Sequence, residues 1–350
     1  MEKNNMISFW RIIFTLMIAL FHFFNVYGFA TGWYIGTDFF FLVSGWLLAK
    51  DAATKDRSAY SYTLHRIKRL YPEYIIAFIY SAVIMADALK YTASDLFGWL
   101  RDSGIYELFM MHTWGWNNRD KYANVPTWYL SALIISSLVL YSLLKICPRL
   151  LKEVIIPVLA LVYMTYSFRT FGNIGIDEVV GPFGNMRLLR GLTEMALGIL
   201  IYSFNRKYGY LLKSKGIRAF GFILLAFTAV HSFFEYGNMD YIYIILLSVG
   251  IAISFEAPLP SRRKVITVCD KYSYSFFLNH SALRNYIMPK FFDGITAWSM
   301  IVYLICVALI SVVTHNVAIL IARFCRVMFD NYKKKMSRKK RRRRRPVSRA

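Results

Sequence analysis

The chain has 350 residues, of which 57% are apolar and only 18% are charged, and its mean hydropathy is +0.40. Soluble domains carry about a quarter of charged residues, so this composition excludes an ordinary soluble domain, and its apolar content excludes a disordered chain. The formal net charge is +23, but twelve of the 43 Lys and Arg residues lie within residues 333–349, so much of that charge belongs to a short tail.

Ten apolar segments approach the length that a bilayer requires of a helix. They are residues 6–26, 33–49, 72–89, 128–146, 154–168, 187–204, 217–234, 239–255, 271–289 and 297–322. The segments predict an all-α fold, a polytopic transmembrane helical bundle of about ten spans. Residues 1–326 are expected to form one integral membrane domain and residues 327–350 a basic cytoplasmic tail.

The distribution of basic residues predicts the orientation, because Lys and Arg collect on the cytoplasmic side. With the N-terminus inside, the inner segments hold 21 Lys and Arg residues besides the tail, and the outer segments hold 8. Both termini are therefore predicted to be cytoplasmic. A variant that uses residues 105–114 as an eleventh span would reverse every later loop and place the tail outside.

Ionisable residues inside predicted spans mark candidate sites, because a charge in a bilayer is costly. Arg11 and His22 share one face of the first span, since eleven steps of 100° end about 20° past three full turns. Asp38 in the second span is expected at the depth of His22. A carboxylate beside an imidazole stabilises its protonated form, as a general base requires. The alternative is a buried hydrogen bond that only joins two helices.

The first inner segment ends in LHRIKRLYP, residues 64–72. Arg66 and Arg69 share a helical face, with Lys68 adjacent, and closely placed guanidinium groups suit phosphates. By itself the cluster is better explained by topology, because inner segments are basic in general.

The largest outer segment, residues 90–127, is rich in aromatic residues, among them Trp99, Trp114 and Trp116. An aromatic belt at the membrane surface is slightly favoured as their explanation. The alternative is a platform that stacks on sugar rings.

The tail contains no acidic residue between positions 333 and 349. Such a run is typical of nucleic-acid arms, but after a last membrane span an anchor to anionic lipid is the better interpretation. We therefore expect anionic lipid at the tail and no nucleic-acid partner.

From residue 9 to about residue 281 the chain resembles the acyltransferase 3 family of integral membrane acyltransferases. The matching segments are FWRIIFTLMIALFHFF, GWYIGTDFFFLVSGWLL, HRIKRLYP, LLRGLTEMALGILIY and YSYSFFLNHS. The first two carry an R-x10-H pattern and a G-x-D-x-F-F-x-x-S-G pattern, and this pair is fairly specific.

The resemblance implies transfer of an acyl group, often acetyl, from cytosolic acyl-CoA to a hydroxyl of an extracytoplasmic saccharide or glycolipid. His22 would then be catalytic together with Asp38. Arg66 and Arg69, with Lys68 beside them, would bind the acyl donor, and Arg11 would line its path. The expected place is a bacterial inner or plasma membrane.

Acyl-CoA is expected as a co-substrate rather than a tightly bound cofactor. No metal is expected, since no two histidines stand at ligand spacing on one helix.

One segment departs from the family pattern. Many relatives have W-S-L-x-x-E where this chain has PTWYLSALI, residues 126–134. Trp128, Leu130 and Ser131 remain, but Leu133 stands where an acid would be expected, and Glu194 is a candidate substitute. Further candidates for acceptor or supporting residues are Ser44 and His280, although a polar contact across helices is favoured for His280 over a catalytic role.

Two rival functions fit a multi-span chain: a transporter or flippase, and a polymerase or ligase of a surface saccharide. Transporters usually show related halves, and residues 1–170 have no convincing likeness to residues 171–330. A polymerase would need no cytosolic phosphate-binding site.

Overall fold

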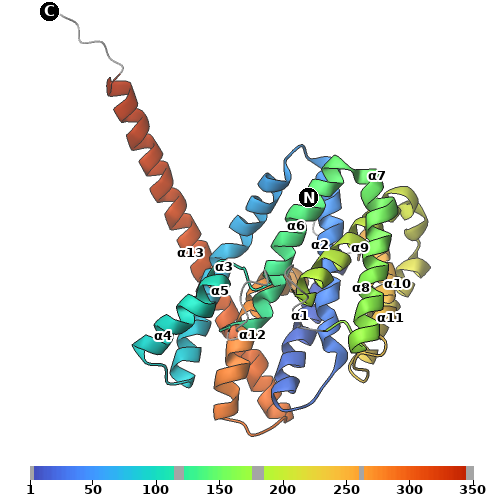
Figure 1. Cartoon of the computed structure of the whole chain (residues 1–350), viewed down its shortest axis with the longest axis horizontal. Helices are drawn as coiled ribbons and strands as arrows, with labels where there is room; N and C mark the ends of the chain where they lie inside the picture. The colour runs from blue at the N-terminus through green and yellow to red at the C-terminus, as the bar shows by residue number, and fades with distance from the viewer. Residues whose placement is uncertain (1–3, 114–121, 176–184, 260–263, 344–350) are drawn as a thin grey trace, which may run out of the picture.

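The computed structural model describes residues 4–113, 122–175, 185–259 and 264–343. The regular elements of this part of the chain are all helical, and most of them pack into one bundle (Figure 1). The all-α prediction is therefore confirmed.

A helix occupies each of the ten predicted segments. These helices are α1 (Asn5–Val26), α2 (Gly36–Thr54), α3 (Ala59–Ala88), α6 (Trp128–Ile146), α8 (Ile156–Phe171), α9 (Met186–Tyr208), α10 (Lys215–His231), α11 (Asp240–Glu256), α12 (Lys264–Ala282) and α13 (Ala297–Arg343). Within the described residues, five helices are long and apolar enough to cross a membrane by length and composition. The count of ten spans stays a prediction.

Helix α3 begins at Ala59, well before the predicted start of its span at residue 72. The hydroxyl oxygen of Ser58 accepts a hydrogen bond from the backbone N–H of Ser61 and caps this end. The HRIKRLYP segment is therefore helical rather than a loop, and Pro72 lies inside the helix.

Part of the large outer segment is helical and packs against α3. Helices α4 (Ala93–Trp99) and α5 (Ile105–Leu108) are joined by a π-helical turn, Leu100–Gly104. The hydroxyl of Tyr71, near the middle of α3, donates to the carbonyl of Leu108 at 3.2 Å. Helix α5 covers only four residues of the proposed eleventh span.

The aromatic residues of this segment are partly core residues. Trp99 is buried and stacks on Phe78 of α3, with ring centroids 6.2 Å apart. Trp99 therefore belongs neither to a surface belt nor to a sugar platform. Trp114 and Trp116 lie outside the described residues.

Helices α2 and α9 pack with their backbones in contact. A Cβ atom on Gly45 would lie 1.9 Å from the carbonyl oxygen of Met195, and one on Gly198 would lie 2.2 Å from that of Leu42. Only glycine fits at such a crossing. The last glycine of the G-x-D-x-F-F-x-x-S-G pattern thus has a packing role, which fixes the position of Asp38 relative to α9.

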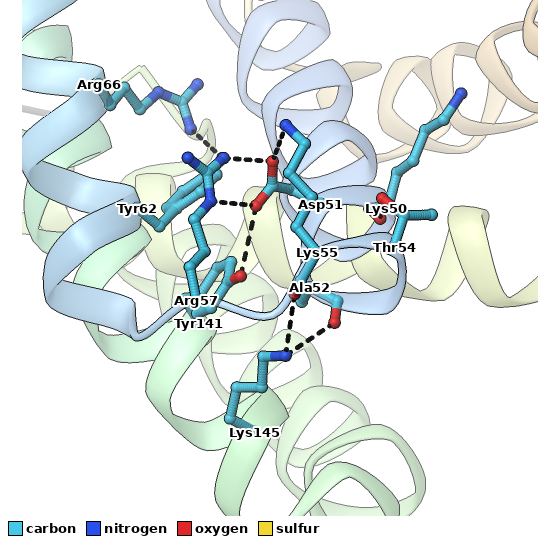
Figure 2. Close-up of polar contacts among 10 residues, drawn as sticks. All are labelled: Lys50, Asp51, Ala52, Thr54, Lys55, Arg57, Tyr62, Arg66, Tyr141 and Lys145. Atoms are coloured by element: carbon cyan, nitrogen blue, oxygen red, sulfur yellow. Dashed lines mark hydrogen bonds and ion pairs between the residues drawn. The ribbon is translucent and has the colours of Figure 1, made fainter.

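Helix α2 ends and α3 begins at one end of the bundle, the upper end in Figure 1. Basic residues gather around this connection, among them Lys50, Lys55, Arg57 and Lys145 (Figure 2). We call this end the basic end. Helix α1 begins at the same end. Asn4, which caps it, donates a hydrogen bond to the carbonyl oxygen of Ser254 near the end of α11. Helix α13 runs unbroken past residue 327, so the expected boundary between domain and tail is not an end of secondary structure.

Candidate active site

A cavity of about 720 Å³ opens at the basic end between α1, α2, α3, α6 and α12. Its walls are largely apolar, and four basic side chains line it: Arg11, Lys50, Arg66 and Arg69. Three of these were predicted to bind an acyl donor or to line its path. Lys68, predicted with them, is exposed and is not among the lining residues.

Arg66 is oriented by neutral groups only. Its guanidinium donates to the hydroxyl oxygens of Ser44 at 2.9 Å, Ser137 at 3.1 Å and Tyr62 at 3.1 Å. Among the residues that the structure describes, neither Arg66 nor Arg69 forms an ion pair with a carboxylate. The cavity therefore holds two guanidinium groups whose charge is free to bind an anion.

Figure 2 shows that Asp51, an acid at the same end of the bundle, is bound by partners other than Arg66. The carboxylate of Asp51 accepts hydrogen bonds from Lys55 at 2.8 Å, from Arg57 at 2.6 Å and from Tyr141 at 3.3 Å. Burial alone would raise the pKa of Asp51, but the hydrogen bonds from Arg57 and Lys55 outweigh it and hold that pKa below its ordinary value.

The cavity follows one face of α1. Arg11 forms an ion pair with Asp270 of α12 at 3.1 Å, and Thr15 and Ile18 line the cavity further in. These positions continue at helical spacing to His22, which the predicted stripe from Arg11 also reaches. His22 itself lies one turn beyond the lining residues.

His22 contacts His280 of α12 and Arg284 of the π-helical turn that follows α12. The Nη1 atom of Arg284 lies 3.2 Å from His22 Nδ1 and 3.0 Å from the His22 carbonyl oxygen. The rings of His22 and His280 stack with centroids 5.2 Å apart. Because a guanidinium only donates, His22 Nδ1 must accept, which leaves the proton of the neutral ring on Nε2.

His280 has the opposite tautomer. Its Nδ1 lies 2.5 Å from the carbonyl oxygen of Phe277, which can only accept, so Nδ1 carries the proton. The Nε2 atom of His280 is then an unprotonated acceptor, and it is buried without a hydrogen-bond partner among the described residues. The fully buried His280 therefore offers the lone pair, and His22 the proton.

Phe277 borders both the cavity and the histidines. Its side chain lines the cavity, and its ring centroid lies 5.7 Å from that of His280. A molecule in the cavity is thus one aromatic side chain away from the His22–His280 pair.

The predicted contact between His22 and Asp38 is not formed among the described residues. Asp38 is fully buried and accepts from Arg190 Nε at 2.7 Å, and the same Nε lies 3.1 Å from Glu194 Oε1. Helices α1 and α2 do pack together, with the rings of Phe14 and Phe39 stacked at 4.4 Å between centroids. Asp38, however, lies against Arg190 of α9, which crosses α2 at Gly45 and Gly198.

Arg190 is the site residue that sequence reasoning missed, because it was counted with the outer basic residues. The signal was present: Arg190 and Glu194 stand four residues apart inside an apolar segment, which places them on one helical face.

A family model described as an acyltransferase domain matches residues 4–316. The chain belongs to the acyltransferase 3 family. It is therefore a membrane acyltransferase of the class that transfers groups other than aminoacyl groups. Neither curated proteins nor solved structures gave a match in the other two comparisons.

Of the remaining predicted residues of this acyltransferase, Ser44 lines the cavity, whereas Trp128 and Ser131 do not. The hydroxyl of Ser131 accepts from the backbone N–H of Thr113 at 3.2 Å and holds the outer segment. The ring of Trp128 lies 5.3 Å from the Arg187 guanidinium. Leu133 does line the cavity, so an apolar group stands at the position where an acid was expected, and Glu194 is not among the lining residues.

Proposed function

We propose that this acyltransferase moves an acyl group, acetyl in the first instance, from cytosolic acyl-CoA to a hydroxyl of an extracytoplasmic or lipid-linked saccharide. The enzyme would cross a bacterial inner or plasma membrane about ten times, with both termini in the cytoplasm. One observation carries the donor assignment: the cavity of about 720 Å³ holds two guanidinium groups that have no carboxylate partner in the described part of the chain. The cavity lies at the basic end, which is predicted to be cytoplasmic.

In this proposal the phosphates of CoA bind Arg66 and Arg69. The pantetheine arm extends along the α1 face past Thr15 and Ile18, which brings the thioester toward His22. The acceptor hydroxyl comes from the opposite end of the bundle.

The reaction forms a C–O bond and breaks the C–S bond of the thioester. The two tautomers favour His280 rather than His22 as the group that takes the hydroxyl proton, on its unpartnered Nε2. The Nε2–H of His22 can donate to the thioester as charge develops, and the sulfur leaves as a thiol once it is protonated. Arg284 holds His22 in the donating tautomer. Side-chain movement of Phe277 must open the path to His280.

Donor binding can be tested with purified protein and CoA. Arg69→Ala, alone and with Arg66→Ala, is expected to weaken CoA binding, because each guanidinium supplies a forked contact to phosphate that alanine removes. Lys at these positions should restore binding only in part, because its ammonium lacks the planar fork. Lys68→Ala is the matched control, since Lys68 is basic and adjacent but does not line the cavity. CoA binding as tight as that of the parent in the double Ala variant would overturn the donor site.

The acceptor can be tested in cells. Mass spectrometry of surface glycans should show acyl groups that disappear when the gene is deleted and return with the parental gene but not with His22→Gln. Unchanged glycan acylation after deletion would contradict a saccharide acceptor.

A further inference from the structure

A second cavity, of about 460 Å³, also lies at the basic end, on a different face of α2. Trp46 and Lys50 of α2 line the donor cavity, whereas Ala49, Ala52 and Ala53 line the second one. The other walls come from the end of α6, the turn after Pro148, and the last turns of α9. We call this second cavity the α2–α9 groove.

The charge of the α2–α9 groove is entirely positive. Its only charged lining residues are Lys152, Arg206 and Lys207, and none of the lining residues is acidic. Within the described parts of the chain, none of these three side chains pairs with a carboxylate; the Lys207 ammonium lies 5.0 Å from the Tyr208 ring. Three cations that line one groove favour a ligand whose anionic group accepts several hydrogen bonds, such as phosphate.

The floor of the groove is held in place by hydrogen bonds from a lysine side chain to backbone carbonyl oxygens. Lys145 at the end of α6 donates to the carbonyl of Ala52 at 3.0 Å and to that of Lys55 at 3.3 Å, which holds the last turn of α2 against α6 (Figure 2). The alanine side chains on this turn leave the space open, so the groove exists without rearrangement.

The rest of the groove lining is mostly apolar. Leu144, Pro148, Ile199 and Tyr202 line it together with the three alanines. Ile199 precedes Arg206 by seven residues, about two turns on the same face of α9, so an apolar surface continues from the cations along that helix. Such a combination is expected where a helical bundle passes from the hydrocarbon to the charged surface of a bilayer. A soluble phosphate would use the cations but not this apolar lining.

We propose that the α2–α9 groove binds the phosphate headgroup of an anionic phospholipid, with an acyl chain lying along Leu144 and Ile199. The site is separate from the donor cavity and does not depend on the proposed acyl transfer. It is also distinct from the basic tail, because none of its lining residues lies within residues 327–350.

The test compares lipid binding by the full-length protein in detergent, with phosphatidylglycerol as the probe and phosphatidylcholine and inorganic phosphate as reference ligands. Lys152, Arg206 and Lys207 are changed together to Gln. Lys213, Lys215 and Arg218, which lie at the same end but do not line the groove, are changed together to Gln as the control with equal charge loss. Ser203→Trp fills the groove and keeps every cation.

Lipid retained in native mass spectrometry and the shift of the melting temperature are measured. The parent and the control are expected to retain phosphatidylglycerol, whereas the triple groove variant binds it roughly tenfold or more weakly, because each cation near an anionic headgroup contributes. Ser203→Trp should also lose it. The proposal is overturned if the groove variant retains phosphatidylglycerol like the parent, if the control loses it equally, or if inorganic phosphate protects as well as the lipid.

Discussion

Arg190 stands between two buried carboxylates. Asp38 Oδ2 and Glu194 Oε2 have no hydrogen-bond donor, so the guanidinium is their main compensation among the described residues. One cation facing two carboxyl groups makes the cluster more sensitive to loss of the cation than to loss of either acid.

Arg190→Met is therefore expected to destabilise the protein by about 3–5 kcal/mol, the typical cost of removing one partner of a buried ion pair. Asp38→Asn should cost less, since Glu194 remains to pair with Arg190. Thermal unfolding in detergent measures both. Equal stability of the Arg190→Met protein and the parent would show that the cluster contributes no net stability.

The two histidines lead to a separate activity prediction. His280→Gln and His22→Gln should each lower the rate of acyl transfer per folded molecule by about 10²–10⁴-fold, because glutamine can hydrogen-bond but cannot carry a proton at neutral pH. His231→Gln is the control, as His231 contacts Tyr243 at 2.7 Å on another part of the bundle. Parental transfer by His280→Gln with an inactive His22→Gln would assign the base to His22 alone.

At the scale of elements, the α2–α9 crossing decides where the ionisable groups point. The contact of Gly45 and Gly198 with the facing backbones leaves no room for a side chain, and these same helices carry Asp38 and Arg190. A change in this crossing would thus move charged groups as well as helices.

Gly198→Ala is expected to destabilise the bundle by roughly 1–3 kcal/mol, the usual cost of overpacking, because its Cβ would lie 2.2 Å from a backbone oxygen. Gly216→Ala is the control: no heavy atom lies within 4 Å of its Cβ position, so the substitution should be neutral or slightly stabilising. Melting temperatures in detergent compare the two. A similar response at both positions would argue against the close crossing.

The break between α5 and α6 is a second feature at this scale. Glu107 accepts from the backbone N–H groups of Ala123 and Asn124, both at 2.8 Å, and so satisfies backbone donors that a continuous helix would satisfy by itself. Buried irregular backbone needs such partners, which explains a fully buried acid in a segment expected to be an outer loop.

For the whole molecule, the location of the basic end predicts the topology. A reporter that works only in the cytoplasm should be active when it is fused after residue 350. A reporter that works only outside the cytoplasm should be active when it is inserted at Gly294, between α12 and α13. The reason is that the predicted inner segments hold most of the Lys and Arg residues. Activity of the C-terminal fusion outside the cytoplasm would contradict the ten-span arrangement and the cytoplasmic donor site.

The apolar runs of the sequence were sufficient to locate the helices, because helix formation in an apolar medium depends on local composition and on satisfying every backbone group. The runs were less informative at polar helix ends. Helix α3 extends back over HRIKRLYP because a capped helix tolerates charged residues that face a cavity. Helical spacing predicted only that Arg66 and Arg69 share a face, and the family resemblance added Arg11; all three line one cavity.

Only the tertiary structure decided which side chains meet. Spacing along one helix gives the depth of a residue and its face, but not the rotation of the neighbouring helix, which is set by packing between distant segments. His22 therefore meets Arg284, 262 positions away, and Asp38 meets Arg190, 152 positions away. The glycine contacts and the His22–Arg284 bond are made between helices, and no property of either helix alone contains them.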